Sequence, residues 1–297
     1  MDAILRLGVD VVLWLQQASP SLDGFFKTLT FLGNEEFFLL LLPLVYWSVD
    51  RVIGMRLIVL LLFSNLINTA VKLFAAQPRP YAYDARVKAI THEVSYGFPS
   101  GHTQNTVAVW GYLGSKVRAK WFWLLAGLLM VGVPLSRIYL GVHFPTDVLG
   151  GYVIGAVVLW LFLRFWKPVE RWFCRLALVW QLVITTFAPL TLLALHASES
   201  VTTGVGTMVG MGVGFVLERH WVRFETAGPI RHRVLRFLIG LVVLIGLWAG
   251  LRVLFAGIEP AMALRLVRYT LVGLWGALGA PWLFVRFRIA RQSTMPA

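Results

Sequence analysis

Residues 52–75 read VIGMRLIVLLLFSNLINTAVKLFA. A helix needs about 20 predominantly apolar residues to cross a bilayer, and this run is of that length. Further runs of similar length follow, so that 58% of the 297 residues are hydrophobic and only 14% are charged. Soluble domains carry about 25% charged residues. The sequence therefore predicts an all-α fold, a polytopic membrane helical bundle.

The same composition excludes other classes of protein. Cys174 is the only cysteine, which excludes an extracellular scaffold built on disulfides. The hydrophobicity excludes disorder. The net charge of +13 is typical of nucleic-acid binders, but in a membrane chain Lys and Arg gather in cytoplasmic loops. We therefore expect the lipid bilayer as a partner, and no nucleic acid.

Nine apolar segments are candidate transmembrane helices. They lie at residues 24–47, 52–75, 102–117, 121–140, 145–166, 174–196, 200–217, 236–257 and 264–287. Ahead of them, residues 3–17 form an amphipathic pattern that Ser19-Pro20 ends. Such a pattern is typical of a helix lying in the membrane interface.

Positive charge alternates between the gaps that separate these segments. The cation-rich gaps and the tail hold Arg51 and Arg56; Lys116, Arg118 and Lys120; Arg164, Lys167, Arg171 and Arg175; Arg219, Arg223, Arg231, Arg233 and Arg236; and Arg286, Arg288 and Arg291. If all nine segments span, these cations share one face, which the positive-inside rule makes cytoplasmic. The sequence thus predicts a multi-pass protein of the cell (plasma) membrane, with its N-terminus outside and its C-terminus inside.

Glycines repeat every four residues in the later helices. The repeats are Gly151 and Gly155; Gly206, Gly210 and Gly214; and Gly246 and Gly250. Small residues on one face let helices approach closely. We expect internal helix packing first, with a homodimer through the Gly-rich helices as the alternative.

The outer face holds the one long polar loop, residues 76–101. Its position predicts a rim or lid over a site, and a solvated loop with interfacial tyrosines is the alternative. Three clusters of polar residues lie at this same face. Ionisable groups near membrane depth are expensive and usually mark function.

The first cluster is KLFAAQPRP, residues 72–80. Lys72 lies near the outer end of the second predicted helix, and Arg79 follows just past that end. Seven residues are about two helical turns, so both cations can point toward one locus. Snorkelling to the interface is the competing explanation for Lys72.

The second cluster is PSGH, residues 99–102, directly before the third predicted helix. Ser100 has the chemistry of a helix N-cap, and Gly101 lets a ligand approach the backbone closely. The free N–H groups of a helix N-terminus attract an anion. His102 projects from this first turn. A cap followed by a polar residue is the plainer interpretation.

The third cluster is SRIYLGVHFPTD, residues 136–147. Arg137 lies near the outer end of the fourth helix. If Pro145 begins the fifth helix, Asp147 lies just inside that helix and His143 just before it. The carboxylate can then accept the imidazole N–H, which fixes the tautomer and leaves the other nitrogen as a nucleophile. The alternative is a buried His–Asp pair that only stabilises the turn.

Together, the clusters place three cations, two histidines, one carboxylate and a Ser-Gly cap on one face. Arg79 and Arg137 can bind the oxygens of a dianionic phosphoryl group in bidentate fashion. The two histidines suit covalent catalysis with an acid–base partner.

At this point the chain resembles the type 2 phosphatidic acid phosphatase superfamily, whose pattern is Lys-x6-Arg-Pro, Pro-Ser-Gly-His and Ser-Arg-x5-His-x3-Asp. Every specified position matches. The nine-helix plan is more similar to the glucose-6-phosphatase and sphingosine-phosphate phosphatase branches than to six-helix lipid phosphatases. We therefore expect an interfacial helix over 1–23, a catalytic phosphatase core over 24–173, and C-terminal transmembrane helices over 174–297 with no assigned role.

The resemblance implies a role for each residue. His143 attacks phosphorus and forms a phosphohistidine, Asp147 orients His143, and His102 protonates the leaving group and then activates water. The phosphate-binding groups implied are Lys72, Arg79, Ser100, the Gly101 N–H and Arg137. Three fixed cations can take the place of a metal, and no carboxylate cluster suited to magnesium appears on this face. We expect a metal-independent enzyme without a cofactor.

The expected substrate is a lipid phosphate or diphosphate, taken laterally from the membrane leaflet. Phosphatidate, phosphatidylglycerophosphate, undecaprenyl (di)phosphate and sphingoid-base phosphate all fit. A sugar-phosphate phosphatase similar to glucose-6-phosphatase and a lipid phosphotransferase are alternatives. An oxidoreductase resembling the vanadium haloperoxidases is a further one, against which the membrane spans argue. A non-catalytic lipid-binding or transport protein would not need the His143–Asp147 pair.

Overall fold

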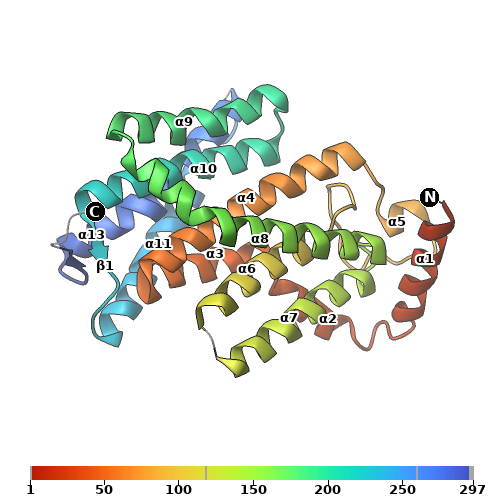
Figure 1. Cartoon of the computed structure of the whole chain (residues 1–297). Coiled ribbons are helices and arrows are strands. Elements are labelled where there is room, and N and C mark those ends of the chain that lie inside the picture. The colour runs from red at the N-terminus through yellow and green to blue at the C-terminus, as the bar shows by residue number, and fades with distance from the viewer. Residues whose placement is uncertain (1, 118, 259, 294–297) are drawn as a thin grey trace. The chain divides into compact units, whose positions relative to one another are not determined.

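The computed structural model describes residues 2–117, 119–258 and 260–293, and these are mostly helical (Figure 1). The elements follow the chain as α1 (Asp2–Gln16), α2 (Asp23–Phe31), α3 (Glu35–Leu44), the π-helix η1 (Val45–Val49), α4 (Arg51–Ala75), α5 (Pro80–Tyr83), α6 (Gly101–Val117), α7 (Lys120–Tyr139), α8 (Pro145–Arg175), α9 (Leu178–Leu195), α10 (Glu199–Leu217), the π-helix η2 (Glu218–Val222), β1 (Phe224–Glu225), α11 (Ile230–Leu254), α12 (Ala261–Leu274), the π-helix η3 (Trp275–Gly279), α13 (Ala280–Arg286) and β2 (Arg291–Gln292).

One small sheet departs from the all-α prediction. Strands β1 and β2 pair antiparallel, with Phe224 opposite Gln292 and Glu225 opposite Arg291. The backbone leaves the preceding helix at Arg223, whose φ of 49° lies in the left-handed region. This turn directs residues 224–225 away from the helix axis and toward the C-terminal segment.

Every predicted apolar segment falls on helix, but the count of nine spans is not confirmed. Among the described residues, six helices are long and apolar enough to cross a membrane, or seven if the bent pair Asp23–Phe31 and Glu35–Val49 is one span. Helix α6 has 17 residues and a polar first half, and the apolar part of α9, Leu178–Ala194, is also short. The orientation of the two termini stays a prediction.

The first predicted segment, 24–47, is not one straight helix. Helix α2 ends at Phe31 and α3 begins at Glu35, with a bend of 42° between them. A Cβ atom on Gly33 would lie 2.9 Å from Cδ2 of His102, so only glycine fits at the bend. The Gly33-Asn34-Glu35 sequence carries the chemistry of a helix start, and this signal could have revealed the break.

The chain forms two compact units, and α3, α4 and α8 each contribute to both. The first comprises residues 1–39 and 63–166, and the second residues 40–62 and 167–297. All eight residues predicted to form the site belong to the first unit. The functional division at residues 23 and 173 stays a prediction.

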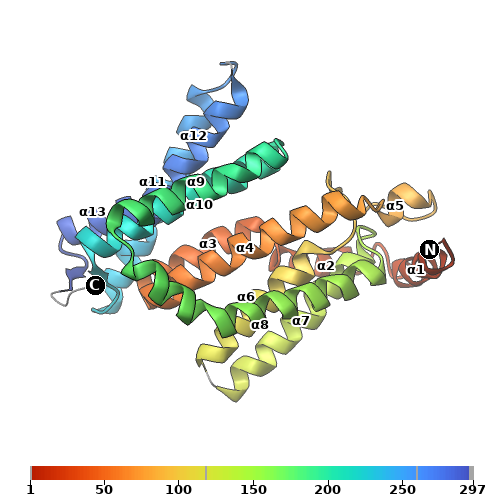
Figure 2. The ribbon, with the colours of Figure 1, turned by 45° about the horizontal axis from the view of Figure 1, so that its top comes forward.

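Helix α6 is the central helix of the first unit. Its residues 103–114 are all buried, and it lies among α4, α7 and α8 (Figures 1 and 2). Polar side chains join it to α4: Ser64 Oγ donates to Asn105 Oδ1 over 2.7 Å, and Asn68 Nδ2 donates to Gln104 Oε1 over 2.9 Å. Because unpaired polar groups are costly in apolar surroundings, these bonds set the register of the two helices.

Glycines of α8 allow the closest approach to α6. A Cβ on Gly151 would lie 2.7 Å from the Ser100 carbonyl oxygen, and one on Gly155 would lie 2.8 Å from that of Gln104. The prediction of internal packing is confirmed for this pair of glycines. The contact holds the start of α6 directly against the start of α8.

We expect Gly151→Ala to lower both stability and activity. The new methyl group must push the Ser100 carbonyl and the Thr103 side chain, at 2.7 and 2.8 Å, away from α8. Overpacking of this kind costs about 1–3 kcal/mol. Thermal melting of the detergent-purified protein measures the effect. Gly127→Ala on α7, where no atom lies within 4 Å of the added Cβ, is the control and should leave melting unchanged.

The second unit uses its glycines in the same way. Helix α10 packs against α9 and α12 (Figure 2). A Cβ on Gly206, Gly210 or Gly214 would lie 2.8 Å from the Leu266 carbonyl oxygen, 2.1 Å from that of Thr270, or 2.6 Å from Ala277 Cβ. Internal packing is thus confirmed for this triplet as well. Added Cβ atoms on Gly246 and Gly250 meet nothing within 4 Å, and the dimer alternative stays a prediction.

Candidate active site

The turn between α7 and α8 holds His143 between two apolar clusters. Its neighbour Val142 packs with Phe26 and Tyr139, and Phe144 packs with Val9 and Val12 of α1. The turn is possible because Gly141 has a φ of 78°, in the left-handed region. Burial of both flanking side chains fixes the backbone on which the imidazole stands.

His143 and Asp147 form the predicted pair. Helix α8 begins at Pro145, as the sequence indicates, and Asp147 Oδ2 lies 3.1 Å from Nδ1 of His143. The same oxygen accepts the Phe144 N–H over 2.9 Å, and Oδ1 accepts Gln77 Nε2 over 2.7 Å. An imidazole that donates from Nδ1 to this carboxylate presents an unprotonated Nε2.

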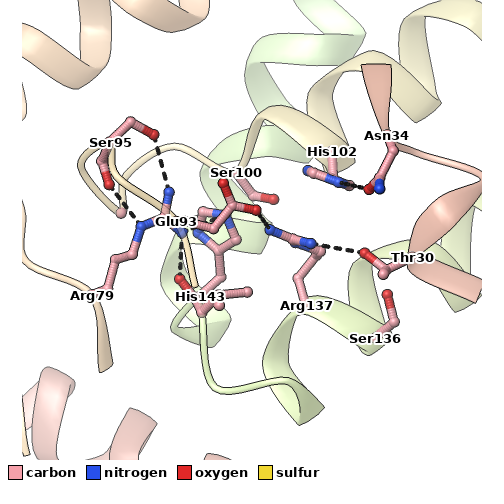
Figure 3. Close-up of polar contacts among 12 residues, drawn as sticks. Thr30, Asn34, Arg79, Glu93, Ser95, Ser100, His102, Ser136, Arg137 and His143 are labelled. Atoms are coloured by element: carbon pink, nitrogen blue, oxygen red, sulfur yellow. Dashed lines mark hydrogen bonds and ion pairs between the residues drawn. The ribbon is translucent and has the colours of Figure 1, made fainter. Parts of the chain in front are cut away.

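Arg79 lies beside that second nitrogen. Its Nη1 is 3.4 Å from Nε2 of His143 and donates to the Val142 carbonyl over 2.8 Å (Figure 3). Its Nε and Nη2 donate to the carbonyl and the hydroxyl of Ser95, over 2.7 and 3.1 Å. The guanidinium is thus held rigidly against the nitrogen that would attack phosphorus.

Arg137 is the second buried guanidinium. It lies in the last turn of α7, and its Nη1 donates to Thr30 Oγ1 over 2.8 Å. Its Nη2 forms an ion pair with Oε1 of Glu93 (Figure 3). Its backbone carbonyl also accepts the N–H of His143 over 3.3 Å. Arg137 therefore links the positive charge of the site to the turn that carries His143, the predicted nucleophile.

The Pro-Ser-Gly-His turn is fixed from three sides. The Ser100 N–H donates to the Asp147 carbonyl over 3.0 Å, and Ser100 Oγ accepts the Thr103 hydroxyl over 3.0 Å. Asn68 Nδ2 donates to the Pro99 carbonyl over 3.3 Å. Helix α6 begins at Gly101, so its first N–H groups open at the site. Ser100 Oγ also accepts the Thr103 N–H over 3.4 Å, so Ser100 caps α6 as the sequence predicts.

His102 and Lys72 complete the predicted set. Nε2 of His102 lies 2.8 Å from Asn34 Oδ1, at the bend between α2 and α3 (Figure 3). Lys72 lies in the last turn of α4 and donates to the carbonyls of Tyr96 and Gly97, the latter over 3.4 Å.

The prediction that helical spacing brings Lys72 and Arg79 to one locus is wrong. Helix α4 ends at Ala75, and Ala76 has a left-handed φ of 45°, so the two cations do not share a helix. Arg79 instead occupies the N-cap position of α5. The chain turns back after α4, and it is this turn that returns Arg79 to the site.

The site is buried and positively charged. Arg79, Arg137 and His143 are 4%, 2% and 2% exposed, and Asp147 is fully buried. Burial holds the pKa of His143 well below its usual value of 6.5, and the positive charges of Arg137, Arg79 and Lys72 lower it further. The imidazole is therefore neutral at pH 7, which is the state a nucleophile requires.

Several contacts of the site lie outside the predicted residues. They are made by Thr30, Asn34, Asn68, Gln77, Glu93 and Ser95. Asn68 precedes Lys72 by one helical turn, and this spacing could have pointed to it. No pattern marks Glu93, because its partner Arg137 is remote in sequence. In the described part of the chain, no group of three or more His, Cys, Asp or Glu side chains could hold a metal ion.

Comparison with known proteins identifies the class. A model of the PAP2 superfamily matches residues 53–171, and a model described as the PAP2 superfamily phosphatase, transmembrane extension, matches residues 202–292. Phosphatidylglycerophosphatase B of Bacillus subtilis (strain 168) is 32% identical over 169 residues, which are 51% of this chain and 79% of that protein. The chain belongs to the PAP2 superfamily, and it is an integral, multi-pass membrane protein.

Two further relatives come from eukaryotes. Lipid phosphate phosphatase delta of Arabidopsis thaliana is 30% identical over 172 residues, or 52% of this chain and 41% of the plant protein. Glucose-6-phosphatase 3 of Mus musculus is 29% identical over 196 residues, or 58% of this chain and 56% of the mouse protein. The matched part of the chain thus spans about half the length of these two relatives.

Proposed function

We propose that this protein is a membrane phosphatase that hydrolyses a lipid phosphate or diphosphate through a phosphohistidine. The single observation that carries the proposal is the buried His143–Asp147 pair, with Nε2 of His143 directed at Arg79. A protein that only binds or transports a lipid needs no oriented nucleophile. Membership of the PAP2 superfamily supports the same reaction.

The proposed reaction has two steps, and His143, His102 and Asp147 supply every group that it needs. Nε2 of His143 attacks phosphorus while the bond from phosphorus to the leaving oxygen breaks, and a protonated His102 gives its proton to that oxygen. His102 then takes a proton from water, whose oxygen attacks the phosphohistidine. The phosphorus–nitrogen bond breaks, inorganic phosphate leaves, and His143 is restored. Asp147 stabilises the positive imidazole ring that exists between the two steps.

Lys72, Arg79 and Arg137 bind the negatively charged phosphoryl oxygens. The N–H groups at the start of α6 donate to the same oxygens. Such preorganised donors stabilise the charge of the transition state in a buried site. We therefore propose that turnover needs no metal ion.

The connectivity within the first unit supports a proposal for the membrane face of the site. The site gathers the last turns of α4 and α7 with the first turns of α6 and α8. The opposite ends of α6 and α7 carry Lys116 and Lys120, which the positive-inside rule assigns to the cytoplasm. We propose that the site opens on the non-cytoplasmic side of the cell membrane, at the level of lipid headgroups.

A lipid substrate is favoured by the names of two relatives, a lipid phosphate phosphatase and a phosphatidylglycerophosphatase. A sugar phosphate is the second candidate, because the chain also matches glucose-6-phosphatase 3 of Mus musculus. The site binds the phosphoryl group in both cases, so the alcohol portion decides between them.

Phosphate release from purified protein tests the proposal. We expect turnover of at least one of phosphatidate, phosphatidylglycerophosphate, undecaprenyl (di)phosphate and sphingoid-base phosphate, undiminished by a chelator. Activity on glucose 6-phosphate alone would favour the second candidate, and loss of activity with the chelator would contradict metal independence. Phosphorylated lipid products would indicate phosphotransfer, and halide oxidation with added vanadate would indicate a haloperoxidase.

A further inference from the structure

One short segment of the outer loop contacts all three cations of the site. The segment comprises residues 93–97. Its Tyr96 and Gly97 carbonyls accept hydrogen bonds from Lys72, and the Ser95 carbonyl and hydroxyl accept them from Arg79. It also gives the Glu93 carboxylate to Arg137 (Figure 3). The groups that would hold a phosphoryl group are thus engaged by oxygens of this segment.

Glu93 differs from the other partners because it carries charge. The side chain of Arg137 is 3% exposed and that of Glu93 is 32% exposed, so the carboxylate reaches a buried cation from the surface. Carboxylate and phosphate oxygens compete for the same guanidinium donors. Only a ligand that takes the particular Nη2 N–H group that now donates to Glu93 must occupy the position that Glu93 holds.

We infer that Glu93 is a specificity-determining residue: its carboxylate occupies a phosphoryl-oxygen position on Arg137, and an anion binds by displacing it. This inference rests on the proposed function and extends it. Glu93 would select for dianionic substrates, namely phosphate monoesters and terminal diphosphates. It would select against singly charged anions such as phosphodiesters.

The charges of the site give the reason. With Glu93 in place, three cations face the carboxylates of Glu93 and Asp147, which leaves one formal positive charge. A monoanion that displaces Glu93 exchanges one negative charge for another and gains nothing electrostatically. A dianion adds one more negative charge to the buried cluster and neutralises it.

The displacement needs only a side-chain movement. The Glu93 carbonyl accepts the Tyr81 hydroxyl over 2.8 Å, and the Gly97 N–H donates to the Gln77 carbonyl over 2.8 Å, so both ends of the segment are tied down. Between them, Val94, Ser95 and Tyr96 are exposed. No buried apolar surface has to be opened when the carboxylate swings toward solvent.

The test compares Glu93→Gln with the wild-type full chain at pH 8. Binding of inorganic phosphate, a dianion, and dimethyl phosphate, a monoanion, is measured by calorimetry and by competition with turnover. We expect Glu93→Gln to bind phosphate about 10-fold more tightly, a change of about 1.4 kcal/mol. Dimethyl phosphate should compete measurably only with the variant. Glutamine keeps the shape and a neutral hydrogen bond but removes the competing charge.

Asp84→Asn is the matched control. It removes one negative charge from the same loop, but Asp84 pairs with the exposed Arg86. Its phosphate affinity should equal that of wild type. Unchanged or weaker phosphate binding by Glu93→Gln would overturn the inference, because Glu93 would then only support Arg137. If Glu93→Gln does not fold, Glu93→Asp, whose shorter side chain reaches Arg137 less well, must show the tighter binding.

The two proposals fail in different ways. A wild-type protein that binds phosphate and hydrolyses a phosphate ester, with Glu93→Gln unchanged, would leave the phosphatase standing and remove only the role of Glu93. If the wild-type protein hydrolysed no phosphate ester, the proposed phosphatase function would be refuted. Calorimetry would still report whether the charge of Glu93 opposes anion binding.

Discussion

Replacing His143 with alanine should lower kcat by about 10⁴-fold or more. No other described side chain contacts both Asp147 and Arg79 and could supply a nucleophilic nitrogen there. The protein should remain folded, since the turn is held by Val142 and Phe144 on either side and not by the imidazole. Phosphate release from the preferred substrate measures the loss, and size exclusion with thermal melting checks the fold.

His196→Ala is the control for this variant, because it makes the same chemical change at an exposed position between α9 and α10. It should retain wild-type activity. A second readout is the covalent intermediate: rapid acid-free quenching should trap phosphate on the wild-type protein and on His196→Ala, but not on His143→Ala. Turnover by His143→Ala within 10-fold of wild type would refute the assignment of the nucleophile.

Replacing Asp147 with asparagine lowers kcat by about 10³-fold or more while the fold persists. Asparagine fills the same volume and can still bond to the Phe144 N–H, but it removes the negative charge 3.1 Å from Nδ1 of His143. The imidazole carries a positive charge once Nε2 bears phosphate, and the buried carboxylate is its counterion. Single-turnover kinetics should show the loss in formation of the phosphohistidine.

Two comparisons separate this effect from a general loss of charge. Asp84→Asn, at the surface beside Arg86, should leave kcat unchanged. The double variant of His143→Ala with Asp147→Asn should be no slower than His143→Ala alone, because Asp147 acts through the imidazole. Additive losses would show that Asp147 acts independently, and a loss smaller than 10-fold would make the pair a structural feature of the turn.

Local sequence patterns were enough to predict much of the secondary structure of the first unit. Pro145 begins α8 and places Asp147 one turn from His143, and Ser100 caps α6, all as the sequence predicts. These features depend on residues only a few positions apart, whose backbone preferences and hydrogen bonds act locally. Apolar runs likewise marked the long helices, because membrane-length hydrophobicity is a property of the segment itself, but not α5, which lies in the predicted polar loop.

Contacts between remote segments were beyond such patterns. The packing of Gly33 against Val133 and His102, at 2.7 and 2.9 Å from an added Cβ, joins segments about 70 to 100 residues apart. The hydropathy of α6 can be modest, since α4, α7 and α8 surround the helix and shield its polar side chains from lipid. A polar run in the sequence looks the same whether protein or water surrounds it, so sequence alone could not count the spans.

The amino-acid sequence by itself determined which residues carry charge, nucleophilicity and helix caps, and that they recur at the ends of apolar helices. Only the tertiary structure decided which of them touch. The pairing of Arg137 with Glu93 and the return of Arg79 to His143 arise where the chain turns back on itself. The physical reason is that hydrogen bonds and ion pairs depend on distances of about 3 Å in space, which spacing along a chain specifies only within one helix or turn.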